Sequence, residues 1–204
     1  MRDCFALLDE PRRPWLDPDL LKQKFLCLSA QFHPDRVHRA SDEEKRGAQL
    51  RYAELNAAYN CLREPKERLG HLLELERGAK PKEIQDIPPG LMDRFLEVSQ
   101  LCRQADEVLA EKGRVTSPLL KVEMFERAQE WSEKLAATQR QIHSLREGLI
   151  TELRELDARW LVVGDSALEA REDLLQRLEE LHRLFSYFTR WGGQIQERIV
   201  QMAF

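Results

Sequence analysis

The spacing of apolar residues in the second half of the chain is the feature that most constrains the fold. The first of three apolar series contains Leu91, Phe95, Val98, Cys102, Ala105 and Leu109. The second contains Leu120, Met124, Ala128, Trp131, Leu135, Ile142, Leu145, Leu149, Leu153, Leu156 and Trp160. The third contains Leu174, Leu178, Leu181, Phe185, Phe188, Ile195, Ile199 and Met202. Intervals of three and four residues are typical of one face of an α-helix, and three such faces can bury one another. We therefore predict an antiparallel three-helix bundle over residues 91–204, with two long helices.

The first half of the chain predicts shorter helices. A first helix ends before Pro11, and a second one, capped by Asp17 or Asp19, carries apolar residues at intervals of four and three. Those residues are Leu21, Phe25, Leu28 and Phe32. The second helix should stop at His33-Pro34-Asp35, because a proline disfavours the α conformation in the residue before it.

Two further helices follow the proline. Ser41 and Glu44 form a capping-box pattern that predicts a helix start, and the apolar face then continues through Tyr52, Leu55, Tyr59 and Leu62. Pro65 occupies the position that proline favours in a first helical turn, so a fourth helix should begin there. No segment alternates with a period of two, and we expect an all-α chain.

Glycine and proline residues divide the chain into three parts. Gly78-Ala79-Lys80-Pro81 and Ile87-Pro88-Pro89-Gly90 interrupt the helical pattern. We predict an N-terminal domain at residues 1–77, a linker at 78–90 and the bundle at 91–204.

Charge and apolar content exclude several classes of partner. The chain has 32 basic and 36 acidic residues, a net charge of −4, which favours neither nucleic acid nor a membrane as partner. It has no apolar run long enough to span a bilayer, and its first residues lack the pattern of a targeting peptide. We expect a soluble, cytoplasmic protein.

The cysteines do not form a metal-binding pattern. Cys4, Cys27, Cys61 and Cys102 are scattered without a CxxC pair, so we expect buried, reduced thiols and neither a metal nor a cofactor. No group of His, Cys or paired carboxylates has catalytic spacing, so we predict that the chain is not an enzyme.

The His33-Pro34-Asp35 tripeptide has a specific setting. An apolar helix leads into it, a polar loop with Arg36 leads out, and the following helix ends in Glu64-Pro65-Lys66-Glu67-Arg68. Residues 2–76 therefore resemble the J-domain of DnaJ-type co-chaperones, a helical hairpin with an HPD loop plus two short helices.

The J-domain resemblance implies a chaperone-binding site. Its residues would be the tripeptide and the basic positions Lys22, Lys24 and Arg36. The resemblance implies that these residues dock on an ATP-bound DnaK-class chaperone and accelerate ATP hydrolysis in that partner. On physical grounds, Pro34 lowers the entropy that the loop loses on docking, and Asp35 offers a carboxylate to a partner arginine.

Residues 66–97 are similar to a narrower family. The segments His71-Leu72-Leu73-Glu74-Leu75-Glu76-Arg77-Gly78 and Pro89-Gly90-Leu91-Met92-Asp93-Arg94-Phe95-Leu96-Glu97 resemble HscB, the J-protein family of iron–sulfur cluster assembly. This resemblance implies an HscA-class or DnaK-class ATPase as one partner and an IscU-like scaffold protein as the client. By position, it assigns Leu91, Met92, Phe95 and Tyr187 to the client face.

The apolar pattern adds Leu96 to this face. Met92 and Leu96 lie beside the first apolar series and widen it, which suggests a protein contact, although residues at such an edge can also simply seal a core. The chain has Leu96, Ser99 and Arg103 where the resemblance places carboxylates. A J-domain protein with an unrelated client, or a structural coiled-coil interaction protein, therefore remain alternatives.

Overall fold

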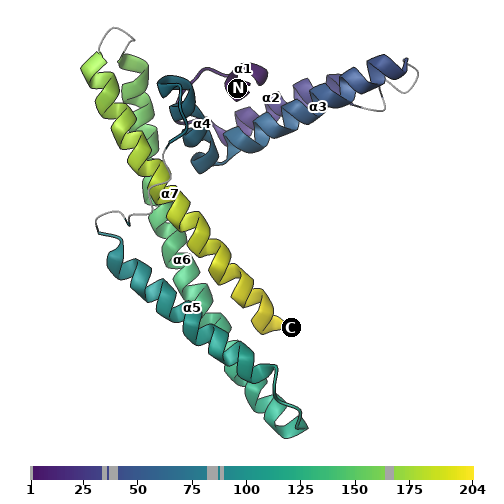
Figure 1. Cartoon of the computed structure of the whole chain (residues 1–204), viewed down its shortest axis with the longest axis vertical. Helices are drawn as coiled ribbons and strands as arrows, with labels where there is room; N and C mark the ends of the chain where they lie inside the picture. The colour runs from purple at the N-terminus through teal and green to yellow at the C-terminus, as the bar shows by residue number, and fades with distance from the viewer. Residues whose placement is uncertain (1, 34–35, 37–40, 82–86, 88–89, 164–167) are drawn as a thin grey trace. The chain divides into compact units, whose positions relative to one another are not determined.

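The structure is a computed structural model that describes residues 2–33, 36, 41–81, 87, 90–163 and 168–204. In these residues the regular elements are helices alone, as the apolar spacing predicts (Figure 1). They are α1 (Cys4–Leu7), α2 (Pro18–Gln31), α3 (Asp42–Arg63), α4 (Pro65–Arg77), α5 (Met92–Lys112), α6 (Pro118–Val162) and α7 (Leu168–Ala203). Among the described helices, none has the length and apolar character needed to cross a membrane.

The chain divides into two compact units that do not follow the order of the sequence. The first unit combines residues 1–83 with 150–182, and the second combines residues 84–149 with 183–204. Helices α6 and α7 each contribute residues to both units.

An antiparallel hairpin of α2 and α3 is the main feature of the first unit (Figure 1). Phe25 stacks on Tyr59 with the ring centroids 4.4 Å apart, and His33 contacts Tyr52. Residue numbers thus rise along one helix as they fall along the other. The buried side chains of this hairpin include Leu21, Leu55 and Leu62, as their spacing predicts.

The ends of these helices follow from local sequence. The carboxylate of Asp17 accepts hydrogen bonds from the backbone N–H groups of Asp19 and Leu20, so Asp17 is the residue that caps α2. Ser41 and Glu44 form the predicted capping box at the start of α3. Pro65 is the first residue of α4, and Gly78 ends that helix with a φ of 71°, a conformation that favours glycine.

Hydrogen bonds of one buried arginine, Arg68, stabilise the junction between α3 and α4. Arg68 is almost fully buried, and its guanidinium donates to the carbonyl oxygens of Pro14 (2.8 Å) and Leu62 (2.5 Å). Burial lowers the pKa of Arg68 to about 10, against the opposing influence of Asp157 and Glu64. Arg68 remains charged at neutral pH and ties the segment before α2 to the end of α3.

The same segment binds the last part of α6 within the first unit. Asp157 is buried and accepts hydrogen bonds from Arg13 Nε (2.9 Å) and the Trp15 backbone N–H (3.1 Å). This carboxylate raises the pKa of Arg13. Trp160 Nε1 donates to the Arg12 carbonyl oxygen at 3.0 Å. Residues 12–15 therefore make polar contacts with α6 as well as with Arg68 of α4.

Three helices share the core of the second unit. Its buried residues come from α5, α6 and α7, and they include Val98, Leu135 and Ile195. Contacts between α5 and α6 pair Arg127 with Glu111 and Arg94 with Gln141, so these two helices run in opposite directions.

Further contacts in the second unit set the direction of α7. Arg198 bonds the Cys102 carbonyl oxygen and Asp106, whereas Lys112 bonds the Met202 carbonyl oxygen. Residue numbers rise together in this pair, so α5 and α7 run parallel to each other.

Some positions of the apolar series differ from prediction. Leu120 and Leu145 are 49% and 41% exposed, although the spacing places them on the buried face of α6. Trp191 is buried and belongs to the core, but the third series omits it. A helix as long as α6 does not keep one continuous buried face, because the residues that cover it change along its length.

Candidate functional site

The end of the α2–α3 hairpin carries His33, the described member of the predicted tripeptide. Helix α2 ends at Gln31, and the His33 carbonyl oxygen accepts a hydrogen bond from the Arg36 backbone N–H at 2.9 Å. His33 and Arg36 are both exposed. The His33 ring meets the Tyr52 ring edge-on. Pro34 and Asp35 lie outside the described residues.

The capping box fixes the other side of this loop. The Ser41 backbone N–H and hydroxyl both donate to Glu44 Oε2 at 2.8 Å, and the Glu44 backbone N–H donates to Ser41 Oγ at 3.3 Å. These hydrogen bonds from Ser41 lower the pKa of the exposed Glu44 carboxyl. Ser41 therefore caps the first turn of α3, next to the predicted binding loop.

The two predicted basic residues of α2 have different surroundings. Lys22 is exposed. Lys24 Nζ lies 3.0 Å from Glu10 Oε1 and donates to the Asp9 carbonyl oxygen at 2.5 Å. Lys24 thus connects α2 to the segment after α1, which leaves Lys22 as the better placed cation for a partner.

The predicted client residues come from α5 and α7 in the second unit. Met92 and Leu96 are 50% and 56% exposed, whereas Leu91 and Phe95 are partly buried against the core. Met92 and Leu96 therefore extend the apolar surface and do not seal the core. Arg94, between them in sequence, is held by Glu97 at 2.6 Å and Gln141 at 3.1 Å.

Tyr187 is also partly buried against this core. Its ring packs beside that of Trp191 with the centroids 5.7 Å apart, and Arg190 lies over it at 5.8 Å. Trp191 packs against Tyr187 and helps to fix its position. This contact was not predicted, because the third apolar series does not include Trp191.

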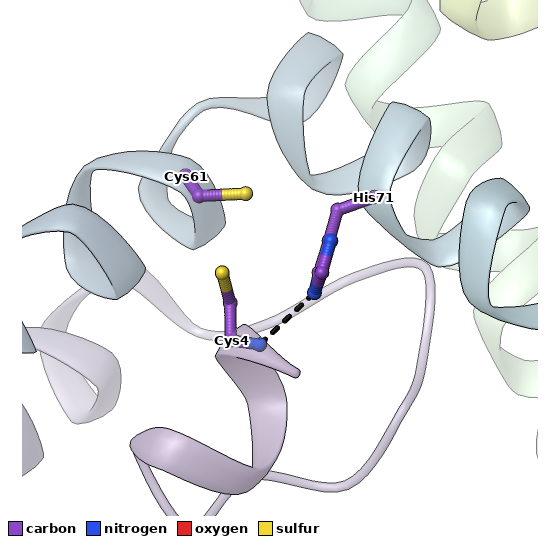
Figure 2. A group of neighbouring side chains, drawn as sticks. All are labelled: Cys4, Cys61 and His71. Carbon is purple, nitrogen blue, oxygen red and sulfur yellow. Dashed lines mark hydrogen bonds between the residues drawn. The ribbon is translucent and has the colours of Figure 1, made fainter. Parts of the chain in front are cut away.

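The cysteines differ from the sequence-based expectation. Cys102 is buried, but Cys27 is exposed and Cys4 and Cys61 are only partly buried. The expectation of buried thiols is wrong for Cys27, because its position on α2 faces solvent. The statement that the chain offers no cluster of metal ligands is also wrong, since Cys4, Cys61 and His71 lie together (Figure 2). Sequence separation conceals this cluster, which forms where α1, α3 and α4 pack.

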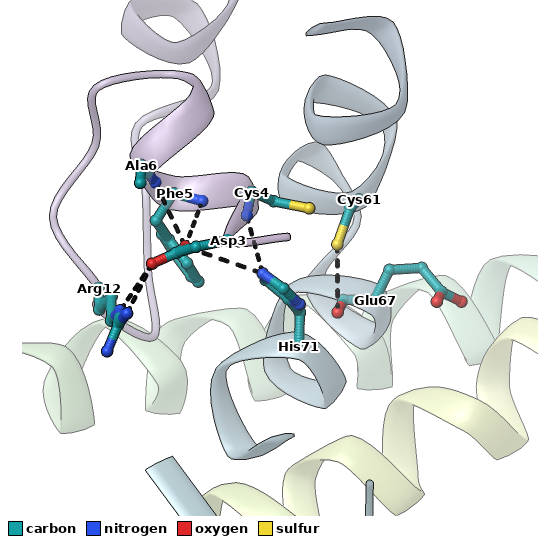
Figure 3. A network of polar contacts seen from close by, with 8 residues as sticks. All are labelled: Asp3, Cys4, Phe5, Ala6, Arg12, Cys61, Glu67 and His71. Atoms are coloured by element: carbon teal, nitrogen blue, oxygen red, sulfur yellow. Dashed lines mark hydrogen bonds and ion pairs between the residues drawn. The ribbon is translucent and has the colours of Figure 1, made fainter. Parts of the chain in front are cut away.

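Hydrogen bonds organise the residues around this cluster (Figure 3). His71 Nε2 accepts a hydrogen bond from the Cys4 backbone N–H at 2.9 Å, and the His71 ring stacks on Phe5 with centroids 5.8 Å apart. Burial lowers the pKa of His71. Contact with the Cys61 thiol lowers the pKa of Cys4, while contact with Cys4 and burial raise the pKa of Cys61.

Comparison with known proteins supports the resemblance to one co-chaperone family. No family model matches the chain. The co-chaperone protein HscB homolog of Bordetella pertussis is 42% identical over 72 residues, 35% of this chain and 42% of the relative. The homolog of Vibrio cholerae is 36% identical over 106 residues, 52% of this chain and 61% of the relative. The matched residues thus span less than two thirds of these relatives.

A solved structure extends the likeness to the fold of nearly the whole chain. The chaperone HscB from Vibrio cholerae superimposes with a TM-score of 0.53, covering 96% of both chains at 20% identity. This structural match shows a shared all-α fold. Together with the sequence matches, it confirms the predicted resemblance to HscB co-chaperones.

Proposed function

We propose that this chain is an HscB-type co-chaperone, not an enzyme, acting in the cytoplasm. In this proposal the α2–α3 hairpin end docks on a DnaK-class or HscA-class chaperone and stimulates its ATPase. The second unit delivers a client, an IscU-like scaffold protein. The observation that carries the proposal is the exposure of His33 at the end of a hairpin in a chain similar to curated HscB co-chaperones.

The contacts of the hairpin hold the helices on both sides of the predicted chaperone-binding loop. The Phe25–Tyr59 stack and the buried leucines hold α2 against α3, and Ser41 closes the first turn of α3. A loop held at both sides loses less conformational entropy when it binds a partner. His33, Pro34, Asp35 and Arg36 would then contact the chaperone, with Lys22 adding long-range attraction to an acidic surface. ATP hydrolysis takes place wholly in the chaperone.

The exposed apolar side chains of α5 support the client-binding part of the proposal. Met92 and Leu96 are half exposed and are not among the residues that form the core of the second unit. Apolar side chains of this kind are common at protein contacts. Leu91, Phe95 and Tyr187 would provide the partly buried base of the same surface. The client would bind there while the J-domain, residues 1–77, engages the chaperone.

A client other than an IscU-like scaffold is the second candidate. The observation that favours it is the chemistry beside Leu96, where Ser99 is partly buried and the exposed Arg103 is basic. A scaffold client and an unrelated client would differ in the charge of the surface that each presents to this face.

Two measurements with the whole chain test the proposal. The steady-state ATPase rate of a DnaK-class chaperone should rise when the chain is added, and the rise should saturate. Calorimetric titration with an IscU-like scaffold should show one binding site. A flat ATPase rate would contradict the chaperone role, whereas absent scaffold binding with intact stimulation would favour the second candidate.

A further inference from the structure

Three metal-ligating side chains from separate helices face one another in the first unit. Cys4 is the first residue of α1, Cys61 lies in the last turn of α3 and His71 lies in the middle of α4. One ligand atom from each residue lies within 4.8 Å of the other two (Figure 2). His71 is 9% exposed, and the two cysteines are partly exposed, so the cluster is enclosed on the histidine side and open on the cysteine side.

We propose that Cys4, Cys61 and His71 bind one Zn²⁺ ion. The donor set decides the class of metal, because thiolate and imidazole ligands select zinc and other soft cations, whereas Mg²⁺ and Ca²⁺ take oxygen ligands. This inference goes beyond the proposed co-chaperone function and does not depend on it.

The geometry of the cluster is close to what zinc requires. With Zn–S bonds of about 2.3 Å and Zn–N bonds of about 2.0 Å, the ligand atoms of a tetrahedral site lie roughly 3.3–3.8 Å apart. The present separations, all within 4.8 Å, must therefore shorten by up to about 1.5 Å. Rotation of the two partly exposed cysteine side chains can supply this change, while His71 stays fixed by its stack on Phe5.

The histidine already presents a lone pair towards α1. His71 Nε2 accepts the hydrogen bond of the Cys4 backbone N–H, so this nitrogen carries no proton. A zinc ion would bind this lone pair in place of the Cys4 backbone N–H. The displaced N–H belongs to the first turn of α1, where backbone N–H groups have no partner within the helix and solvent can satisfy them.

The fourth position of the metal would be filled by water. A carboxylate close to this position is that of Asp3, with Oδ1 3.9 Å from His71 Nε2. Its oxygens are already engaged, because Oδ1 accepts from the Phe5 and Ala6 N–H groups and Oδ2 from Arg12 Nε (Figure 3). Asp3 therefore keeps its capping role, and the open cysteine side admits solvent.

Charge balance favours this arrangement. Binding follows the equation Zn²⁺ + 2 R–SH → Zn(S–R)₂ + 2 H⁺, with neutral His71 as the third ligand. The two thiolates cancel the charge of the metal, so a partly buried complex carries no net charge. The ion would cross-link α1 to α3 and α4, which are far from α1 in the sequence. It would therefore stabilise the first unit.

Cobalt substitution tests the site directly. The whole chain is purified, stripped of metal by a chelator under a thiol-free phosphine reductant, and titrated with Co²⁺. We expect one Co²⁺ per chain, thiolate-to-cobalt charge-transfer absorption, tetrahedral ligand-field bands, release of two protons, and displacement by one equivalent of Zn²⁺. No absorption of this kind, or binding without proton release, would overturn the proposal.

Matched cysteine variants locate the ion. Cys4→Ser and Cys61→Ser should each weaken Co²⁺ binding by at least about 100-fold, because even residues that only support a ligand affect affinity by 10–100-fold. The exposed Cys27 provides the control, and Cys27→Ser should leave the titration unchanged. Circular dichroism checks that each variant folds; since Cys4 is at a helix end, its variant remains informative if Cys61→Ser unfolds. Equal spectra in all three variants, or a Cys4–Cys61 disulfide in place of bound zinc, would overturn the assignment.

Discussion

The ring of His33 meets the ring of Tyr52 edge-on, with the two centroids 6.1 Å apart and the planes at 87°. This contact joins His33, two residues after the end of α2, to the body of α3. It helps to orient the exposed His33 side chain. In our account, Tyr52 is therefore a positioning residue for the chaperone-binding end of the hairpin.

Replacing Tyr52 should reduce chaperone stimulation without abolishing it. An aromatic pair contributes about 0.5–1.5 kcal/mol. Tyr52→Ala should therefore raise the concentration of chain that gives half-maximal ATPase stimulation by roughly 2–10-fold. Tyr52→Phe keeps the ring and should behave like the wild type. If Tyr52→Phe lost as much as Tyr52→Ala, the hydroxyl group rather than the ring contact would be responsible.

Lys22 and Lys24 should respond differently to substitution. Lys22 is exposed, so Lys22→Ala should weaken chaperone binding more at low salt than at high salt, because exposed charges are screened beyond a Debye length of about 8 Å at physiological ionic strength. Lys24 pairs with Glu10, so Lys24→Ala should lower the free energy of unfolding by up to about 1 kcal/mol. Binding at several salt concentrations, together with melting curves, separates the two effects. A salt-independent loss for Lys22→Ala would contradict its proposed role.

Substitutions at the exposed apolar residues of α5 should lower client affinity without lowering the stability of the chain. The double change Met92→Ala and Leu96→Ala removes half-exposed side chains. At about 1–2 kcal/mol for each truncated contact, client affinity should fall tenfold or more, with an unchanged melting temperature.

Val98 provides the matched control for this face. It is 1% exposed, so Val98→Ala should lower the melting temperature, as loss of core methyl groups does. Calorimetric titration with the scaffold and thermal melts measure both effects. Unfolding of the Met92/Leu96 variant, or its normal binding to the client, would exclude this surface.

The buried guanidinium of Arg68 should be necessary for stability. Arg68→Met retains the apolar stem but leaves the carbonyl oxygens of Pro14 and Leu62 without their donor. Each unsatisfied buried group costs about 1–3 kcal/mol, so with two such groups the free energy of unfolding should fall by about 2–6 kcal/mol. The exposed Arg140 serves as control, and Arg140→Met should change it by less than about 0.5 kcal/mol. Equal denaturant midpoints for the two variants would show that the hydrogen bonds of Arg68 contribute little.

Features that depend on neighbouring residues were predictable from the sequence. The capping box at Ser41 and Glu44, the start of α4 at Pro65 and the Phe25 and Tyr59 faces of the hairpin all follow from local spacing. The sequence places Met92 and Leu96 at the edge of an apolar series but leaves open whether they seal the core, and the structure shows both half exposed.

Features that depend on tertiary packing were not predictable. Cys4 and Cys61 are 57 residues apart, and they meet because α1 packs against α3. Asp157 reaches residues 12–15 from a helix that the sequence assigns to the bundle alone. Leu120 and Leu145 fit the spacing of a buried face, but no neighbour covers them fully.

The ATPase assay with a single substitution at His33 is the most direct test of the central claim. His33 is exposed, so His33→Gln should leave the free energy of unfolding within about 0.5 kcal/mol of the wild type. His143 is an exposed histidine on α6 and provides the matched control. The measurement is the rate of ATP hydrolysis by a DnaK-class chaperone as a function of added chain. We expect that His33→Gln abolishes stimulation while His143→Gln stimulates like the wild type. Full stimulation by a folded His33→Gln variant would contradict the claim that the hairpin end activates the chaperone.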